Sequence, residues 1–296
     1  MREDTIEICH LKKAYGEHVI FSNLTMKLKK GAVTCLMAPS GAGKTTLLRI
    51  LAGLEQADGG KIGGLEALRK SMVFQEPRLA EELTAAANIQ LAIRRRMFGK
   101  EKRSSRYLVE EMEELGLSGC ENQAVSELSG GMRQRVMIAM AIINHPDLLI
   151  ADEPTTALDV TIQAQILDIM RRLKGASGSL MLITHNLGVV AEVCDEVAVM
   201  YAGRAVEQGT LAAIFDHPLH PYTKGLMASV PTMYSEKKPL PTIPGSVPTV
   251  YDFEPGCRFA GRCEHCMERC LQESPPTRII NKDHYVQCWL DFDEEA

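Results

Sequence analysis

The sequence lacks a hydrophobic run long enough to cross a lipid bilayer. Its longest apolar run, residues 136–143, is far short of the roughly 20 residues that a membrane-spanning helix needs. Residues 1–13 also lack the apolar core of a signal peptide. We therefore expect a cytosolic chain that does not itself span a membrane.

The sequence also has no excess of basic residues, and it contains no internal repeat. The formal net charge is -5 at pH 7, whereas a nucleic-acid-binding surface is basic because it neutralises phosphates. We therefore expect no nucleic-acid partner. With 296 residues, the chain is long enough for one large domain with a small appendage.

The apolar pattern predicts an α/β fold. Strand-like runs at residues 5–9, 19–28 and 33–37 precede a glycine-rich turn and a helical pattern at 43–52. Helical spacing then predicts a helical subdomain at about residues 78–145. The regions predicted to be helices are residues 84–97, 105–115, 131–143 and 160–173, and those predicted to be strands are 71–74, 147–151 and 179–184.

This alternation of strands and helices is typical of a parallel sheet flanked by helices. A hairpin is predicted around Ala202 and Gly203, followed by two short helices within residues 211–230. We place a nucleotide-binding domain at residues 1–230. Residues 231–255 are rich in Pro, Thr and Ser and predict a linker, so a small cysteine-containing tail completes residues 231–296.

Residues 38–45 match the phosphate-loop pattern G-x-x-x-x-G-K-[ST], except that Ala38 replaces the first glycine. Consecutive amide groups at a helix N-terminus bind phosphate, and glycines let the backbone approach it. Lys44 is expected to reach the β- and γ-phosphates, and the Thr45 hydroxyl to coordinate Mg²⁺. The predicted ATP-binding residues here are Ser40, Gly41, Ala42, Gly43, Lys44, Thr45 and Thr46.

A buried strand that ends in two acids follows at residues 148–153. We expect Asp152 to bind Mg²⁺ through water and Glu153 to act as the base that polarises the attacking water. Two acids at a strand end are also common as a helix cap. The phosphate loop upstream favours the catalytic interpretation.

Residues 128–135, Leu-Ser-Gly-Gly-Met-Arg-Gln-Arg, resemble the signature of ABC ATPases. The resemblance implies a phosphate-loop NTPase (RecA-like) core with an antiparallel β portion and a helical subdomain. It also implies that two cassettes enclose two ATP molecules. Ser129, Gly130 and Gly131 would then bind the γ-phosphate held by the partner, through the amides and dipole of a helix N-terminus.

Four more residues match motifs of the same family. Gln75 resembles the Q-loop residue, which implies contact with Mg²⁺ and ATP. His185 resembles the switch histidine that contacts the γ-phosphate during catalysis. Asp159 resembles the acid that crosses the dimer interface, and Tyr15 resembles the aromatic that stacks on adenine.

Three segments resemble the importer ATPases for dipeptides, oligopeptides and nickel. They are residues 155–166, residues 217–224 and the tail. The segment between Lys44 and Gln75 is shorter than is usual in that branch. The resemblance implies a second ATPase subunit, either a paralogue or a second copy, two membrane permease subunits and an extracytoplasmic solute-binding protein. The chain would then lie peripherally on the cytoplasmic face of the membrane.

The alternatives are a soluble ABC ATPase without a transport role, a regulatory cassette and an importer ATPase for another small solute. DNA-repair cassettes carry a long coiled-coil insertion and ribosomal ones carry two cassettes, and the sequence has neither feature. Intact Glu153 and His185 argue against a regulatory cassette.

In some relatives the counterparts of Cys257, Cys263, Cys270 and Cys288 bind a [4Fe–4S] cluster. Four thiolates suit zinc as well as iron–sulfur. Cys266 forms a C-x-x-C with Cys263, a spacing that also serves zinc. Free structural cysteines are the third interpretation.

Overall fold

The computed structural model describes residues 4–93, 101–156, 158–175, 178–229, 241–248 and 255–292, with the backbone alone at 101–106 and 172–175. The chain forms two compact units. Unit 1 comprises Met1–Lys29, Thr34–Glu66 and Thr184–Ala296, and unit 2 comprises Lys30–Val33 and Ala67–Ile183. Each unit contains both strands and helices.

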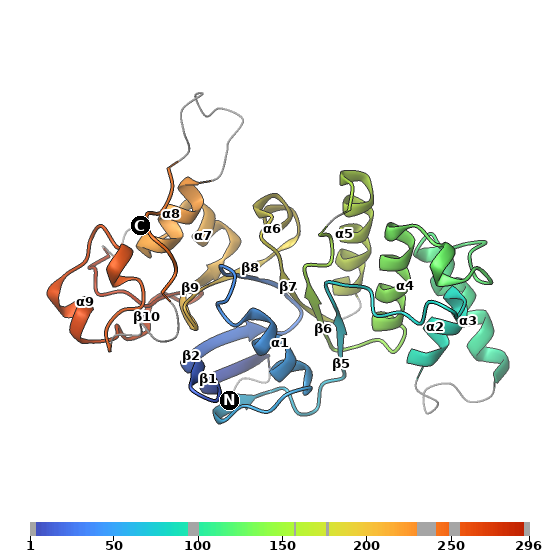
Figure 1. Cartoon of the computed structure of the whole chain (residues 1–296), viewed down its shortest axis with the longest axis horizontal. Helices are drawn as coiled ribbons and strands as arrows, with labels where there is room; N and C mark the ends of the chain where they lie inside the picture. Colours follow the sequence, from blue (N-terminus) through green and yellow to red (C-terminus); the bar gives the residue numbers. More distant parts are fainter. Residues whose placement is uncertain are drawn as a thin grey trace. The chain divides into compact units, whose positions relative to one another are not determined.

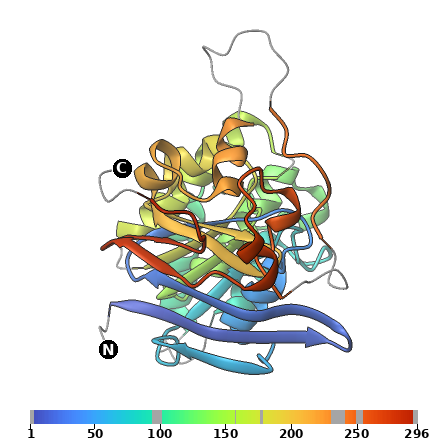
Figure 2. The same ribbon diagram turned by 90° about the vertical axis from the view of Figure 1, so that its left-hand side faces the viewer.

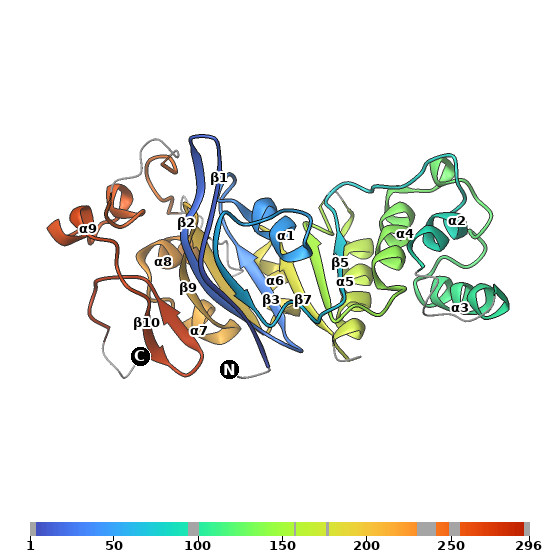
Figure 3. The ribbon, with the colours of Figure 1, turned by 90° about the horizontal axis from the view of Figure 1, so that it is seen from below.

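An antiparallel sheet in unit 1 begins with β1 (Thr5–Tyr15) and β2 (His18–Lys29). Apolar residues on one face of these strands are buried, as the period of two in a strand requires; they include Ile6, Ile8, Phe21, Leu24 and Met26. The short strand β4 (Gly59–Gly63) pairs with the other edge of β1, so the order is β2-β1-β4. Figure 3 shows β1 and β2 side by side along their length.

A second sheet in unit 1 is built on β3 (Val33–Met37) and β8 (Glu196–Tyr201), which are parallel. Strands β9 (Arg204–Thr210), β11 (His284–Val286) and β10 (Arg278–Asn281) extend it antiparallel. The tail strands therefore join the sheet of the nucleotide-binding region, as Figure 2 shows.

Five helices of unit 1 are described. They are α1 (Lys44–Ala52), α6 (Leu187–Val193), α7 (Leu211–Asp216), α8 (Pro221–Ala228) and α9 (Glu268–Gln272). A 3-10 turn, η3, covers Ala260–Arg262. Helix α1 follows the phosphate loop directly and buries Leu47, Leu48, Ile50 and Leu51. This packing fixes the helix on which the loop depends.

Unit 2 holds three parallel strands, β5 (Lys70–Val73), β6 (Leu148–Asp152) and β7 (Ser179–Ile183). Every residue of β6 and β7 is buried, as in strands covered on both faces. Its helices are α2 (Ala85–Ala92), α3 (Glu101–Glu114), α4 (Gly130–Ile142) and α5 (Val160–Gly175), with a 3-10 turn, η1, at Val125–Glu127. Figure 1 shows α2 and α3 beside α4.

Most predicted elements are confirmed within a few residues. The predicted helix at residues 84–97 is wrong in its length, because α2 ends at Ala92 and Ile93 is extended. Strand β1 continues past residue 9 to Tyr15, and β4 and α6 had not been predicted. The domain boundary expected after residue 230 lies outside the described residues.

Candidate functional site

The phosphate loop of unit 1 is shaped by two left-handed glycines. Gly41 has φ 80° and Gly43 has φ 89°, a region that residues with a side chain rarely adopt. A Cβ on Gly43 would lie 2.5 Å from Ile20 Cγ2 and 2.7 Å from the Phe21 ring. Only glycine fits at this position.

Gly43 caps α1 without a side-chain hydrogen bond. The first amides of α1 are therefore not capped by a side chain, which is the arrangement that binds anions at a helix N-terminus. Thr45 and Thr46 occupy the first turn of α1, and Ser40 is exposed in the loop before it. The predicted phosphate-binding residues thus lie together in one loop and helix turn.

Lys44 folds back over the loop that precedes it. Its Nζ donates to the Ala38 carbonyl at 2.7 Å and to the Pro39 carbonyl at 3.1 Å. Ala38 is outside the left-handed region, so alanine replaces the first glycine of the motif without backbone strain. The loop therefore keeps its geometry despite the substitution.

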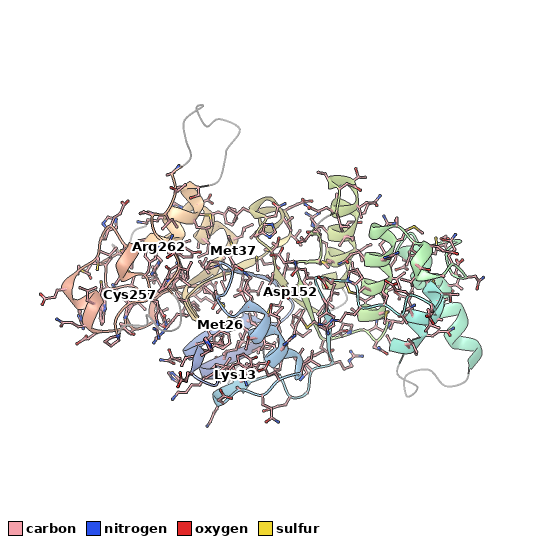
Figure 4. The ribbon with its side chains drawn as sticks, viewed as in Figure 1. Lys13, Met26, Met37, Asp152, Cys257 and Arg262 are labelled. Atoms are coloured by element: carbon pink, nitrogen blue, oxygen red, sulfur yellow. The ribbon has the colours of Figure 1, made fainter. Side chains whose placement is uncertain are left out.

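Tyr15 ends β1 in the same unit, and its side chain is held by polar contacts. Its hydroxyl donates to Glu55 Oε1, and Lys13 Nζ lies 5.1 Å from its ring centroid. Figure 4 labels Lys13 on the antiparallel sheet. His185 is also in this unit. It lies two positions after the end of β7 and directly before the Asn186 cap of α6.

Three of the predicted residues follow neighbouring parallel strands of unit 2. Gln75 comes two residues after β5, and Asp152 and Glu153 come at the end of β6. The register pairs Val73 with Ala151. The carboxyl ends of parallel strands are where ligands bind in open α/β sheets, so these side chains start from the expected edge.

Glu153 has an unusual backbone conformation, with φ 47°. Its amide donates to the Ile183 carbonyl at 3.0 Å, and its Oε2 accepts from the Thr156 hydroxyl at 3.0 Å. Left-handed residues other than glycine are costly and cluster at functional sites. The Glu153 backbone is therefore strained at the position directly after the strand.

The signature sequence forms the start of α4, as predicted. The Ser129 hydroxyl accepts the Met132 amide at 3.3 Å, and a Cβ on Gly131 would lie 2.9 Å from Ile162 Cγ2. Arg133 donates to the carbonyls of Val125, Leu128 and Ser126. These bonds fix the turn that leads into the helix.

Gln134 belongs to the signature, but the sequence alone assigned no role to it. Its side chain is buried, and its Nε2 donates to the Pro154 carbonyl at 2.8 Å. It therefore links the signature helix to the segment directly after Glu153. The sequence feature that could have indicated this contact is a polar residue on the buried side of an apolar helix.

Asp159 caps α5, which begins at Val160. Its Oδ1 accepts the Ile162 amide at 2.9 Å, and its carbonyl accepts the Gln163 amide at 2.9 Å. Within the described part of unit 2, Asp159 therefore has a local structural role. A contact across a dimer interface stays a prediction.

The cysteines of the tail lie near one another in unit 1. The Cys257 amide donates to the Cys270 carbonyl at 2.7 Å, and Cys270 and Cys288 are buried. The pKa of Cys257 is raised to about 11, mainly by burial and to a smaller extent by the nearby thiols of Cys270, Cys288 and Cys263. Burial also raises the pKa of Cys263 and of Cys288.

These thiols do not converge into a metal site as they are placed. Among the described residues, no three His, Cys, Asp or Glu side chains are grouped so that they hold a metal ion. Cys266 is exposed. The structure therefore brings the four predicted ligands into one neighbourhood without assembling a coordination shell.

The tail is anchored to the rest of unit 1 by buried polar contacts. His284 Nε2 lies 2.8 Å from Glu207 Oε1, and the Glu207 carboxylate also accepts the amides of Leu219 and His220 at 2.7 and 3.0 Å. Arg262 donates to the Tyr201 hydroxyl at 3.1 Å. Figure 4 shows Cys257 and Arg262 in this region.

No helix in the part of the chain that the structure describes has both the length and the apolar character needed to cross a bilayer.

Comparison with known families gives two matches along the chain. Residues 21–156 match the family model described as ABC transporter, and residues 206–270 match the model described as Oligopeptide/dipeptide transporter, C-terminal region. The chain is 42% identical over 296 aligned residues to the oligopeptide transport ATP-binding protein AppD of Bacillus subtilis, with 91% of this chain and 90% of AppD covered. The chain belongs to the ABC transporter family.

A second relative in Bacillus subtilis, the dipeptide transport ATP-binding protein DppD, is 39% identical and aligns with 90% of this chain and 88% of its own length. The resemblance to the peptide branch of ABC ATPases is thereby confirmed. The ATPase activity predicted from the motifs is confirmed at the level of the family.

Solved structures agree with this family. The ATP-binding cassette MJ0796, a dimer in a post-hydrolysis state bound to ADP and Pi, has a TM-score of 0.63 and 25% identity, covering 70% of this chain and 98% of its own. A nucleotide-free ATP-binding cassette from an ABC transporter has a TM-score of 0.67 and 21% identity, covering 75% and 98%. The predicted fold, a phosphate-loop α/β core with a helical portion, is confirmed.

Proposed function

We propose that this chain is the ATP-hydrolysing subunit of an importer that carries peptides across the cytoplasmic membrane. The observation that carries the cargo assignment is the match of residues 206–270 to the oligopeptide/dipeptide transporter C-terminal region, because this region distinguishes the branch from other cassettes. The names of AppD and DppD support the same cargo. Nickel complexes are the rival cargo.

In this proposal the phosphate loop binds the triphosphate of ATP. The first amides of α1, at Gly43 and beyond, receive the β-phosphate, and Lys44 exchanges its bonds to the Ala38 and Pro39 carbonyls for bonds to the β- and γ-phosphates. The Thr45 hydroxyl takes a Mg²⁺ position. Ser40, Gly41, Ala42 and Thr46 complete the phosphate contacts, and Tyr15 contacts adenine.

The residues at the carboxyl ends of β5 and β6 carry the hydrolytic step. Asp152 binds Mg²⁺ through water, and Gln75 contacts the metal. Glu153 accepts a proton from the attacking water, while His185 contacts the γ-phosphate. The left-handed backbone of Glu153 and its bond to Thr156 support a preset position for the base.

Ser129, Gly130 and Gly131 act on the ATP held by a second cassette. The start of α4 supports this role, because a helix N-terminus attracts a phosphate and the two glycines leave its backbone accessible. Asp159 lies at the same interface. The active ATPase is therefore a pair of cassettes, and each chain supplies half of each site.

Cys257, Cys263, Cys270 and Cys288 are the residues that would hold a [4Fe–4S] cluster or a zinc ion in the tail. Their thiol chemistry suits such a group, but among the described residues they are not grouped so that they hold a metal ion. A bound metal would supply the positive charge that allows buried thiols to ionise. Iron and acid-labile sulfide in anaerobically purified protein would support the cluster, and zinc alone would support a zinc site. Protein that contains neither iron nor zinc would overturn both assignments.

The importer also includes two permease subunits and an extracytoplasmic solute-binding protein, and the chain lies peripherally on the cytoplasmic face of the membrane. The test is co-expression with the two permease subunits of a peptide importer, purification of the complex and reconstitution in vesicles. We expect ATP hydrolysis to rise when the binding protein is loaded with peptide, and peptide to accumulate in the vesicles.

Loading with a nickel complex in place of peptide is the matched control. Stimulation by nickel alone would overturn the peptide assignment and keep the importer. ATP hydrolysis without any association with a permease would favour a soluble ABC ATPase.

A further inference from the structure

Tyr15 is held at three points around its side chain. Its hydroxyl donates to Glu55 Oε1, and Lys13 Nζ lies 5.1 Å from the ring centroid, the distance of a cation–π contact. Thr46, in the first turn of α1, is near enough to lower the pKa of the Tyr15 hydroxyl, against the larger rise caused by Glu55. The tyrosine thus lies near the first turn of α1.

The groups that hold Tyr15 form a balanced network of charges. Lys13 Nζ lies 3.1 Å from Glu55 Oε1 and 3.3 Å from Asp58 Oδ1, and it donates to the Gln56 carbonyl at 2.9 Å. Asp58 in turn accepts the Ala14 amide at 2.7 Å. Each ion therefore has a partner, and the network also reaches the backbone at Ala14 and Gln56.

The Lys13–Glu55 pair is the sheltered part of this network, whereas the Asp58 side chain is 49% exposed. The side chains of Lys13 and Glu55 are 11% and 17% exposed, whereas those of Lys27 and Glu7, a pair in the same sheet, are 48% and 38% exposed. Exposed pairs contribute little because water screens them and because two long side chains must be ordered. The Lys13 and Glu55 side chains are already ordered.

The ring that this network fixes remains accessible. Tyr15 is 44% exposed, although its hydroxyl is bound and Lys13 lies over the ring. Base stacking on an aromatic ring contributes about 1–3 kcal/mol per base. A ring that is already fixed loses less conformational entropy when the base arrives, so more of that stacking appears as affinity.

We propose that Glu55 and Lys13 are positioning residues for ATP, which hold the Tyr15 ring where it stacks on the nucleobase. The inference rests on the proposed contact between Tyr15 and adenine. It adds that the affinity for the base depends on Glu55, which lies 40 positions away from Tyr15 along the chain. Glu55 fixes the hydroxyl end, and Lys13 sits over the ring and joins Glu55 to Asp58.

The test measures equilibrium binding of ATP and of inorganic tripolyphosphate, which lacks the base, to the full-length chain by calorimetry. Tyr15→Phe removes only the hydroxyl, and Glu55→Gln removes only the charge of its acceptor. We expect each to weaken ATP binding by about 3- to 10-fold, the loss that one hydrogen bond accounts for. Binding of tripolyphosphate should be unchanged.

Three further variants complete the set. Lys13→Met should weaken ATP binding by a similar factor. The double variant Tyr15→Phe with Glu55→Gln should lose less than the two single losses combined, because one substitution weakens the bond that the other removes. Glu7→Gln, which breaks the exposed pair with Lys27, should leave both affinities unchanged.

Tyr15→Ala separates the inference from its premise. If Tyr15→Ala binds ATP as tightly as the natural protein, the adenine contact itself is wrong. If Tyr15→Ala weakens ATP binding but Tyr15→Phe and Glu55→Gln do not, the contact stands and the positioning role is overturned. Equal losses for ATP and tripolyphosphate would also overturn it, because Tyr15 would then act through Thr46 and the phosphate loop.

Discussion

The phosphate loop and the cysteine tail belong to the same unit, yet they are built in different ways. The loop is made of backbone, and its shape depends on left-handed Gly41 and Gly43 and on the start of α1. The tail depends on side chains from positions as far apart as Cys257 and Cys288. The first site is complete when a short segment folds, whereas the second needs four thiols to converge.

This difference explains what the structure shows of each site. Bonds between near neighbours, such as Lys44 to Ala38 and Pro39, fix the loop. In the tail, the four thiols are near enough to influence one another's ionisation, but in the described residues they form no metal-binding group. A backbone site is thus specified by local sequence, and a thiolate site by long-range packing.

The largest effect should come from adding one methyl group to the phosphate loop. Gly43→Ala forces a left-handed alanine, which costs roughly 1–2 kcal/mol, and also puts Cβ 2.5 Å from Ile20 Cγ2. We expect ATP affinity, measured by calorimetry, to fall about 100-fold or more.

Gly41→Ala is the matched control. Its φ is also left-handed, but a Cβ there meets no atom within 4 Å. The ATP affinity of this variant should fall about tenfold or less. Equal losses in the two variants would contradict the close approach of Gly43 to β2.

The part of unit 1 that anchors the tail, at Glu207 and His220, should be sensitive to pH. His220 is buried, caps α8 by accepting the Tyr222 amide on Nδ1 at 3.0 Å, and has its pKa lowered from 6.5 to about 4 by burial. The unfolded chain therefore binds a proton below pH 6.5 that the folded chain does not. The free energy of unfolding should fall as pH drops from 6.5 to 4, by about 3 kcal/mol in all.

The measurement is urea unfolding at several pH values, with His220→Asn as the comparison. Asparagine can cap the helix in the same way but does not titrate. Its stability should depend less on pH between 6.5 and 4. Identical pH dependence in the two proteins would remove His220 from the account.

The smallest effect on nucleotide binding should come from the thiols themselves. Cys263→Ser should abolish iron and sulfide binding, measured chemically, while ATP affinity changes by less than about twofold because Cys263 belongs to neither the phosphate loop nor α1. Cys266→Ser, at an exposed position outside the predicted set, should keep both metal and affinity. Loss of metal in Cys266→Ser would instead favour a zinc site that uses the C-x-x-C pair.

The sequence predicted the parts of the fold that local patterns specify. The start of α4 at Ser129 and the turn at Ala202 and Gly203 depend on residues next to one another, and the structure has both. Strand β4 escaped prediction because three of its five residues are glycines and it has no apolar alternation. Helix α6 is short, and its signal was the cap at Asn186.

The candidate site was predictable to the same extent. Motif order identified the phosphate loop, the acids at the end of β6 and the signature helix. It did not identify Glu55 as a partner of Tyr15 or Gln134 as a partner of Pro154, because these contacts join residues 40 and 20 positions apart. The left-handed backbone of Glu153 is likewise a property of the folded strand end.

The central claim is that this chain hydrolyses ATP through Glu153. The most direct measurement is steady-state phosphate release by the Glu153→Gln variant, alongside ATP binding by the same protein. We predict that turnover falls by at least about 100-fold, as expected for the loss of a general base, while ATP affinity is retained. Turnover within about twofold of the natural protein would contradict the claim.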